Sequence, residues 1–298
     1  MQFRILGHTG EKVSIVGLGG YHMAVPKDPQ ESLRIIRTAI DGGINFMDNC
    51  WDYHEGESER RMGAALRDGY RQKVFLMSKI DSHSKAGATK QIDECLQRLH
   101  TDYIDLMQFH EVIRIDDPEK IFAPGGSYEA ALEAVQAGKI RYLGFTGHKS
   151  PQIHLRMLEV WLSRGSRPAS VQMPLNIMDA HFDSFAAKVV PELLRHDIGV
   201  LGMKPMGAGM FLKSGIATPT EYLHYAMNLP TSVVITGCES VAQVQQAIDA
   251  ADSFRPLTKE QAASIAARAI GLNENGRAEG YKSTTHFDGT TWYPHWLA

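Results

Sequence analysis

Four side chains that can take part in proton transfer occupy similar points of the sequence: Asp48, Tyr53, Lys79 and His110. The carboxylate, the amine and the imidazole each stand at the end of an apolar run of strand character. The phenol follows the carboxylate by five residues, in an irregular turn. A carboxylate, a phenol, an amine and an imidazole at strand ends indicate one proton-transfer site assembled from several elements.

The residue types suggest how such a site would work. A free phenol has a pKa of about 10, and a nearby ammonium favours phenolate, so we expect Lys79 to lower the pKa of Tyr53. Tyr53 would then donate a proton to a carbonyl oxygen, Asp48 would hold Lys79, and His110 would orient or polarise the carbonyl. No serine elbow, reactive cysteine or metal cluster offers a nucleophile. Hydride from a nicotinamide is therefore the natural candidate.

Short apolar runs alternate with amphipathic stretches along the chain, and this alternation predicts the elements that position the site. Strands are expected at residues 13–18, 44–48, 74–79, 104–109, 141–145, 170–173, 200–203 and 232–235. Helices are expected at residues 29–41, 58–66, 88–99, 128–137, 153–162, 185–195, 218–227 and 241–251. Strands this uniformly apolar are covered on both faces, so the pattern predicts a closed (β/α)8 TIM barrel.

The barrel is expected to form one domain over residues 1–298, with an N-terminal β-hairpin and an irregular C-terminal tail from about residue 272 to 298. The alternative is an open doubly wound sheet, but no Gly-x-Gly-x-x-Gly follows a strand in the context that such a fold requires.

Composition limits the classes of partner. A net charge of −3 and a pI near 6.5 give no basic footprint for nucleic acid or a membrane surface, so a small molecule is expected. Three widely spaced cysteines fit a reducing cytoplasm better than a disulfide framework. The sequence has no Cys-x-x-Cys pair that would indicate a metal site. The N-terminal residues lack the pattern of a signal peptide. A cytoplasmic protein is expected.

The text around these four residues resembles the aldo-keto reductases. The similar motifs are Asp-x-x-x-x-Tyr-x-x-x-x-Ser-Glu from Asp48, Leu-x-Arg-Leu-x-Thr-Asp-Tyr-Ile-Asp-Leu before His110, and Gly-Lys-Ile-Arg-Tyr-Leu-Gly from Gly138. The likeness spans residues 3 to about 251. It implies a (β/α)8 reductase of aldehydes or ketones that uses NADP(H) or NAD(H), with Asp48, Tyr53, Lys79 and His110 as catalytic residues.

The same resemblance implies where the cofactor binds. Gln172 is expected to contact the carboxamide, and the loop from Met206 to Gly209 to lie near the pyrophosphate. Met203 stands where the family commonly has an aromatic residue over the nicotinamide, and Lys204 could reach a phosphate. The full set of expected cofactor-binding residues is Gly20, Thr146, Gln172, Met203, Lys204, Gly207, Gly237, Glu239, Ser240 and Gln243.

The choice between NADP and NAD stays open at this point. The family usually grips the 2′-phosphate with a lysine or arginine after the eighth strand, but no such residue occurs between Ser214 and Phe254. Glu239 would repel a phosphate and could accept hydrogen bonds from ribose hydroxyls.

Tyr21 and Trp51 are expected in the substrate pocket, and Cys50 is expected to have a packing role. The aromatic tail could cover the pocket or pack on the barrel or on a second subunit. Two other functions remain as alternatives. One is a cofactor-binding regulatory subunit resembling potassium-channel β-subunits. The other, more distant, is a metal-dependent hydrolase.

Overall fold

The computed structural model describes residues 1–298, in which eight parallel strands close into a barrel. The strands are β3 (Val16–Gly19), β4 (Phe46–Asp48), β5 (Phe75–Ile80), β6 (Ile104–Phe109), β7 (Ile140–Thr146), β8 (Ser170–Pro174), β9 (Gly199–Met203) and β10 (Val233–Thr236). They are neighbours in chain order, and β10 closes the barrel on β3. The expected (β/α)8 barrel is confirmed.

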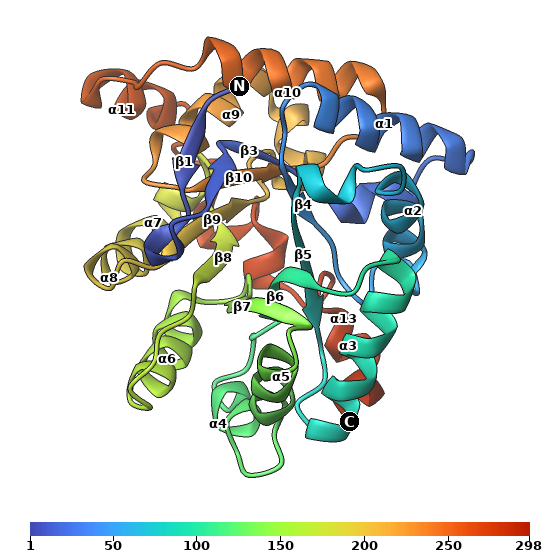
Figure 1. Ribbon diagram of the computed structural model, residues 1–298. Coiled ribbons are helices and arrows are strands. Elements are labelled where there is room, and N and C mark those ends of the chain that lie inside the picture. The colour runs from blue at the N-terminus through green and yellow to red at the C-terminus, as the bar shows by residue number, and fades with distance from the viewer.

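A helix follows each strand and lies on the outside of the barrel, as Figure 1 shows. These helices are α1 (Pro29–Asp41), α2 (Glu57–Ala65), α3 (Lys85–Leu99), α5 (Ser127–Gln136), α6 (Pro151–Leu162), α8 (Val190–Arg195), α9 (Pro219–Asn228) and α10 (Val241–Ser253). The predicted helix over 185–195 is in fact two, α7 (Phe185–Lys188) and α8. Pro191 explains the break, because proline has no amide hydrogen to continue a helix but suits the first turn of a new one. The loop after β6 also contains a short helix, α4 (Asp117–Ile121).

The N-terminal hairpin consists of β1 (Phe3–Ile5) and β2 (Lys12–Ser14), joined through the 3-10 turn η1 (Gly7–Thr9). The predicted first strand from residue 13 is therefore divided between β2 and β3. Leu6 and Val13 are buried in a cluster with Phe46 and other side chains of the barrel interior. The hairpin thus closes the amino end of the barrel, which leaves the carboxyl end for a site.

The expected irregular tail, from about residue 272, contains only single helical turns, but one helix precedes it. After α10 the chain forms α11 (Lys259–Ala267), which was not predicted from the sequence, and then α12 (Gly280–Ser283) and α13 (Gly289–Trp292). Four short 3-10 segments complete this half of the chain: η4 (Asp179–His181), η5 (Gly207–Ser214), η6 (Glu274–Gly276) and η7 (Pro294–Leu297). The tail is built from single turns because its sequence has no run long enough for an independent helix.

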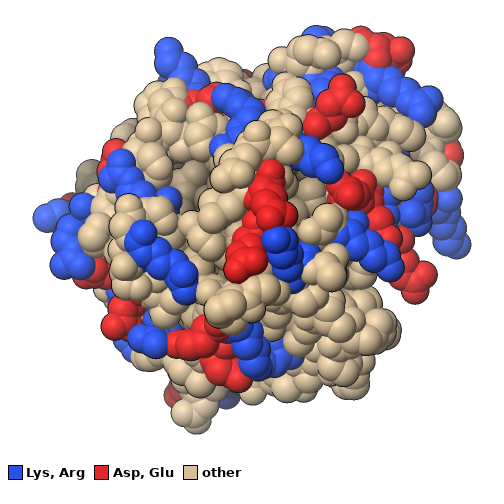
Figure 2. Space-filling view, turned by 60° about the horizontal axis from the view of Figure 1, so that its bottom comes forward, with Lys and Arg blue, Asp and Glu red and all other residues tan.

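Acidic and basic side chains are interspersed on the face seen in Figure 2, with no extended area of one sign. No helix has both the length and the apolar character needed to cross a lipid bilayer.

Two 3-10 segments remain. The segment η2 (Gly20–Ala24) follows β3, and the segment η3 (Arg71–Lys73) precedes β5.

Candidate active site

The barrel geometry aims Asp48 and Lys79 at one another. Phe46 and Met77 belong to the buried cluster inside the barrel. Side chains two residues apart in a strand point the same way, so Asp48 and Lys79 also point inward, one step nearer the carboxyl end. Lys79 Nζ forms an ion pair with Asp48 and donates a hydrogen bond of 2.6 Å to the carbonyl oxygen of Asn49. Both side chains are almost fully buried.

Tyr53 joins this pair from the turn between β4 and α2. Lys79 Nζ donates a hydrogen bond of 3.1 Å to the Tyr53 hydroxyl. The rings of Tyr53 and His110 meet edge to face with their centroids 6.0 Å apart. The structure therefore brings together all four residues that the sequence indicated for proton transfer.

The expected lowering of the pKa of Tyr53 is not found. Burial of the phenol, together with the nearby Asp48 carboxylate, raises its pKa well above the usual value. The ammonium of Lys79 is neutralised by Asp48, which removes most of the effect that was expected from it. Tyr53 is therefore protonated at neutral pH, as a proton donor must be, but it is a weaker acid than a free phenol.

The Nδ1 side of the His110 ring contacts groups that the sequence did not indicate as its neighbours. Its Nδ1 lies 2.8 Å from Asp81 Oδ1 and 3.2 Å from Cys50 Sγ. Burial, with Asp81 nearby, raises the pKa of Asp52 to about 7, and burial raises the pKa of Asp81 well above its usual value. The pKa of His110 is lowered by burial. Since Nδ1 is occupied in this way, Nε2 is the ring nitrogen left for a ligand.

A cavity of about 1170 Å³ opens at the carboxyl ends of the strands. The four residues predicted for proton transfer, Asp48, Tyr53, Lys79 and His110, all lie on its wall. It exceeds the roughly 300–1,000 Å³ that holds one small ligand, so it has room for a cofactor and a substrate. Tyr21, expected in the substrate pocket, also lines the cavity. The expected cofactor residues that line it are Gly20, Thr146, Met203, Lys204, Gly237, Glu239 and Gln243.

Four expected site residues lie off the cavity wall. Gln172 is buried behind it and donates a hydrogen bond of 3.1 Å to Asp48 Oδ2. Ser240 is the N-cap of α10, and Gly207 is covered by the ring of Phe211. Trp51 is turned away because its indole nitrogen donates to Glu94 in α3, at 2.6 Å.

The tail supplies wall residues that could not be placed from the sequence. These are His286, Phe287, Gly289, Trp292, Tyr293, His295 and Trp296. Glu111 anchors this segment by accepting hydrogen bonds from the backbone amides of Gly289 and Thr290, at 2.8 and 2.7 Å. His148 Nε2 contacts Asp288 Oδ1 at 2.8 Å. The tail therefore both packs on the barrel and covers part of the cavity.

Two polar groups fit a bound dinucleotide. Lys204 lies on the cavity wall, and its half-buried ammonium forms no ion pair or hydrogen bond with the protein. An ammonium of this kind suits a phosphate. Gln172 Oε1 is buried without a partner and could accept from a carboxamide. The residues present thus fit a nicotinamide cofactor.

Comparisons with known proteins agree with this geometry. A sequence profile of the aldo/keto reductase family matches residues 15–221. The aldo-keto reductase AKR11C1 from Bacillus halodurans, in its holo form, superposes with a TM-score of 0.74 at 27% identity, covering 90% of this chain and 96% of that one. L-galactose dehydrogenase from Arabidopsis thaliana is 26% identical over 88% of this chain and 91% of its own length.

The aldo-keto reductase AFTS1 from Alternaria alternata is 33% identical, but that match spans only about half of each protein, 48% of this chain and 48% of the relative. The family profile, by contrast, extends over well more than half of the chain. The chain therefore belongs to the aldo/keto reductase family, whose members reduce carbonyl groups with NADP(H) or NAD(H).

Proposed function

We propose that this chain reduces an aldehyde or ketone to an alcohol with Tyr53 as the general acid. The observation that carries the proposal is the hydrogen bond of 3.1 Å from Lys79 Nζ to the Tyr53 hydroxyl at the cavity wall. Because Lys79 occupies a lone pair of that hydroxyl, the phenolic proton is free to point into the cavity. A bound nicotinamide would supply the hydride.

The other residues of the site prepare this proton transfer. Asp48 holds Lys79 in place, and the Lys79 Nζ hydrogen bond to the Tyr53 oxygen persists when Tyr53 has given up its proton. His110 presents Nε2 to the cavity and would hold the substrate oxygen beside Tyr53. Aromatic side chains of the tail exclude water from the same space.

We further propose that NAD(H) is the preferred cofactor. Lys79 and Lys204 are the only lysines on the cavity wall, which carries no arginine, and Lys79 is committed to Asp48 and Tyr53. Glu239 lies at the cavity edge, where it contacts His22 Nδ1 at 2.8 Å. A carboxylate there would repel a 2′-phosphate and accept from ribose hydroxyls.

A fluorescence titration with NADH and NADPH at two ionic strengths tests the cofactor proposal. NADH is expected to bind at least as tightly as NADPH, because Glu239 repels the 2′-phosphate and Lys204, the one unpaired ammonium on the wall, is assigned to the pyrophosphate. The substitution Glu239→Arg is expected to improve NADPH affinity about tenfold or more, equivalent to about 1.4 kcal/mol, and to make it salt-sensitive. Glu239→Gln is the control, since it removes the repulsion without adding a cation.

Two other outcomes would contradict these proposals. Tighter and salt-sensitive NADPH binding by the unmodified chain would mean that another cation reaches the phosphate. Tight binding of either cofactor without turnover of any carbonyl compound would favour the regulatory subunit that the sequence left as an alternative.

Lys204 gives NADH binding a specific pH dependence. Burial lowers the pKa of Lys204 to about 8, although Glu111 and Asp48 act in the opposite direction. The ammonium is present below that pH and lost above it, so the Kd for NADH is expected to be constant below about pH 7 and to rise as the pH passes 8. Lys204→Arg should flatten this rise, because arginine stays charged. An unchanged rise in Lys204→Arg would assign the pH dependence to another group.

A further inference from the structure

His110 and three side chains close to it, those of Cys50, Asp52 and Asp81, together have the composition of a metal site. One sulfur, nitrogen or carboxylate oxygen from each lies within 4.8 Å of all the others. Cys50 Sγ is 3.2 Å and Asp52 Oδ1 is 3.7 Å from His110 Nδ1. Bonds of about 2.0–2.3 Å around a tetrahedral zinc ion place neighbouring ligands about 3.3–3.8 Å apart, which is close to these two separations. Asp81 Oδ1, at 2.8 Å from His110 Nδ1, would have to move away by about 0.5 Å to share the ion.

Each carboxylate of this group has one oxygen without a hydrogen-bond partner, although the other oxygen of Asp81 contacts His110 Nδ1. Asp52 Oδ1 and Asp81 Oδ2 are buried without a hydrogen-bond partner. The Asp81 side chain has no exposed surface at all. Burying a carboxylate oxygen without a donor is costly, and a cation among the four groups would remove that cost.

We propose that Cys50, Asp52, Asp81 and His110 bind a divalent first-row metal ion, with zinc as the best match. Thiolate and imidazole ligands suit zinc, and carboxylates complete a four-coordinate set. Asp52 and His110 also line the large cavity, so an ion can reach the site from there. Cations that bind almost only oxygen ligands, such as magnesium, are disfavoured by the sulfur ligand.

Metal binding would act on the proposed reaction through His110. With Nδ1 as a ligand, the imidazole keeps its remaining proton on Nε2, which is the nitrogen left for the cavity. The metal would therefore fix the tautomer that can donate a hydrogen bond to a carbonyl oxygen. Binding itself requires neither cofactor nor substrate, so the site can be tested apart from the reductase function.

Cobalt titration of the reduced, cofactor-free protein is the test, since cobalt replaces zinc and reports a sulfur ligand by its colour. We expect saturable binding of about one equivalent with a thiolate-to-cobalt charge-transfer band that zinc abolishes. Cys50→Ser should remove the band. Cys95→Ser is the matched control, because Cys95 is equally buried but belongs to α3 and contacts Ser78 instead.

The proposal is overturned if the unmodified protein gives no cobalt band, or if the band survives in Cys50→Ser. In that case the four side chains are only a hydrogen-bonded cluster. Should Cys50→Ser fail to fold by circular dichroism, Asp81→Asn provides the second variant and is expected to weaken cobalt binding at least about tenfold. Tyr53→Phe should bind cobalt normally, which separates failure of the metal site from failure of the catalytic proposal.

Discussion

Replacing Tyr53 by phenylalanine is expected to lower kcat roughly 10²–10⁴-fold, the usual contribution of a positioned general acid. The substitution removes only the hydroxyl group, and the ring keeps its edge-to-face contact with His110. Cofactor affinity should change little, because the proposed cofactor residues lie elsewhere on the cavity wall. Steady-state kinetics with a panel of aldehydes and ketones, beside a cofactor titration, measures both quantities.

Tyr21→Phe is the matched control for this experiment. Tyr21 lines the same cavity, and its ring centroid lies 5.4 Å from that of Tyr53. Its hydroxyl has no contact with Lys79, so its removal should leave kcat close to that of the unmodified chain, while KM can change because Tyr21 is expected in the substrate pocket. If Tyr53→Phe kept more than about a tenth of the activity, Tyr53 could not be the proton donor.

The barrel could be predicted from the sequence because its strands are buried on both faces. Each strand then appears as a short apolar run, and the first polar residue after the run marks the rim, as Lys79 and His110 do. Asp105 shows the limit of this rule. It is polar inside an apolar run, yet it lies near the start of β6, where Arg71 donates to it at 2.8 Å.

The parts of the site that the sequence did not reveal depend on contacts between distant segments. Asp81 stands just beyond β5 and, like Lys79, is a polar residue at the end of an apolar run. Nothing in the neighbouring sequence indicates that it contacts His110. The aromatic residues of the tail could be identified as a cluster but not placed. Their position depends on Glu111, which follows β6 and accepts hydrogen bonds from the tail backbone.

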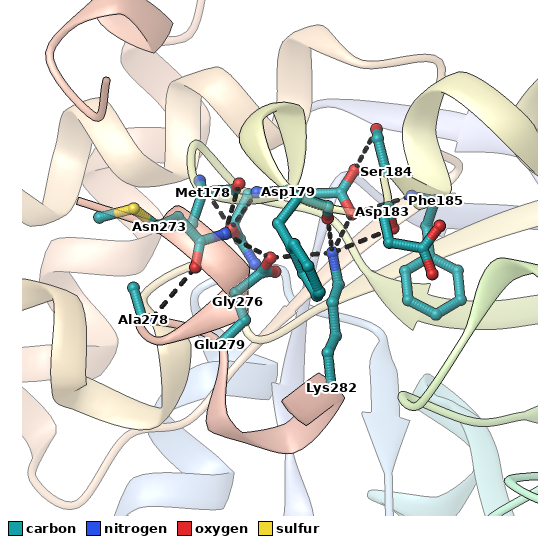
Figure 3. Close-up of polar contacts among 12 residues, drawn as sticks. Met178, Asp179, Asp183, Ser184, Phe185, Asn273, Gly276, Ala278, Glu279 and Lys282 are labelled. Atoms are coloured by element: carbon teal, nitrogen blue, oxygen red, sulfur yellow. Dashed lines mark hydrogen bonds and ion pairs between the residues drawn. The ribbon is translucent and has the colours of Figure 1, made fainter. Parts of the chain in front are cut away.

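A buried charge network fixes the tail to the barrel. The side chain of Lys282 in α12 is buried between the carboxylates of Asp179 and Glu279, at 2.7 and 2.8 Å (Figure 3). It also donates a hydrogen bond to the carbonyl oxygen of Phe182. Asp179 in turn accepts from the backbone amide of Phe185 at the start of α7. One ammonium therefore joins α12, η4 and the loop before α7.

Replacing Lys282 by methionine is expected to lower the free energy of unfolding by about 3–5 kcal/mol, because it leaves two carboxylates buried without their cation. Urea unfolding followed by circular dichroism measures the change. Lys188→Met is the matched control. Lys188 forms an ion pair with Asp183 in the same region, but it is 45% exposed, so its loss should cost less than about 1 kcal/mol.

The origin of the Lys282 effect can be checked by removing one of the stranded charges. Adding Glu279→Gln to Lys282→Met should restore part of the lost stability, since one uncompensated carboxylate disappears. If the double variant were no more stable than the single one, the cost would come from lost packing of the lysine stem.

The same network reaches the cavity through Tyr281. Its hydroxyl donates to Glu279 at 2.7 Å and accepts from Asn176, which also donates to the backbone oxygen of Lys204. Lys282→Met should therefore weaken NADH binding as well as stability, whereas Lys188→Met should leave binding unchanged. If Lys282→Met lowered the stability but left NADH affinity normal, the charge network around Lys282 would not influence the position of Lys204.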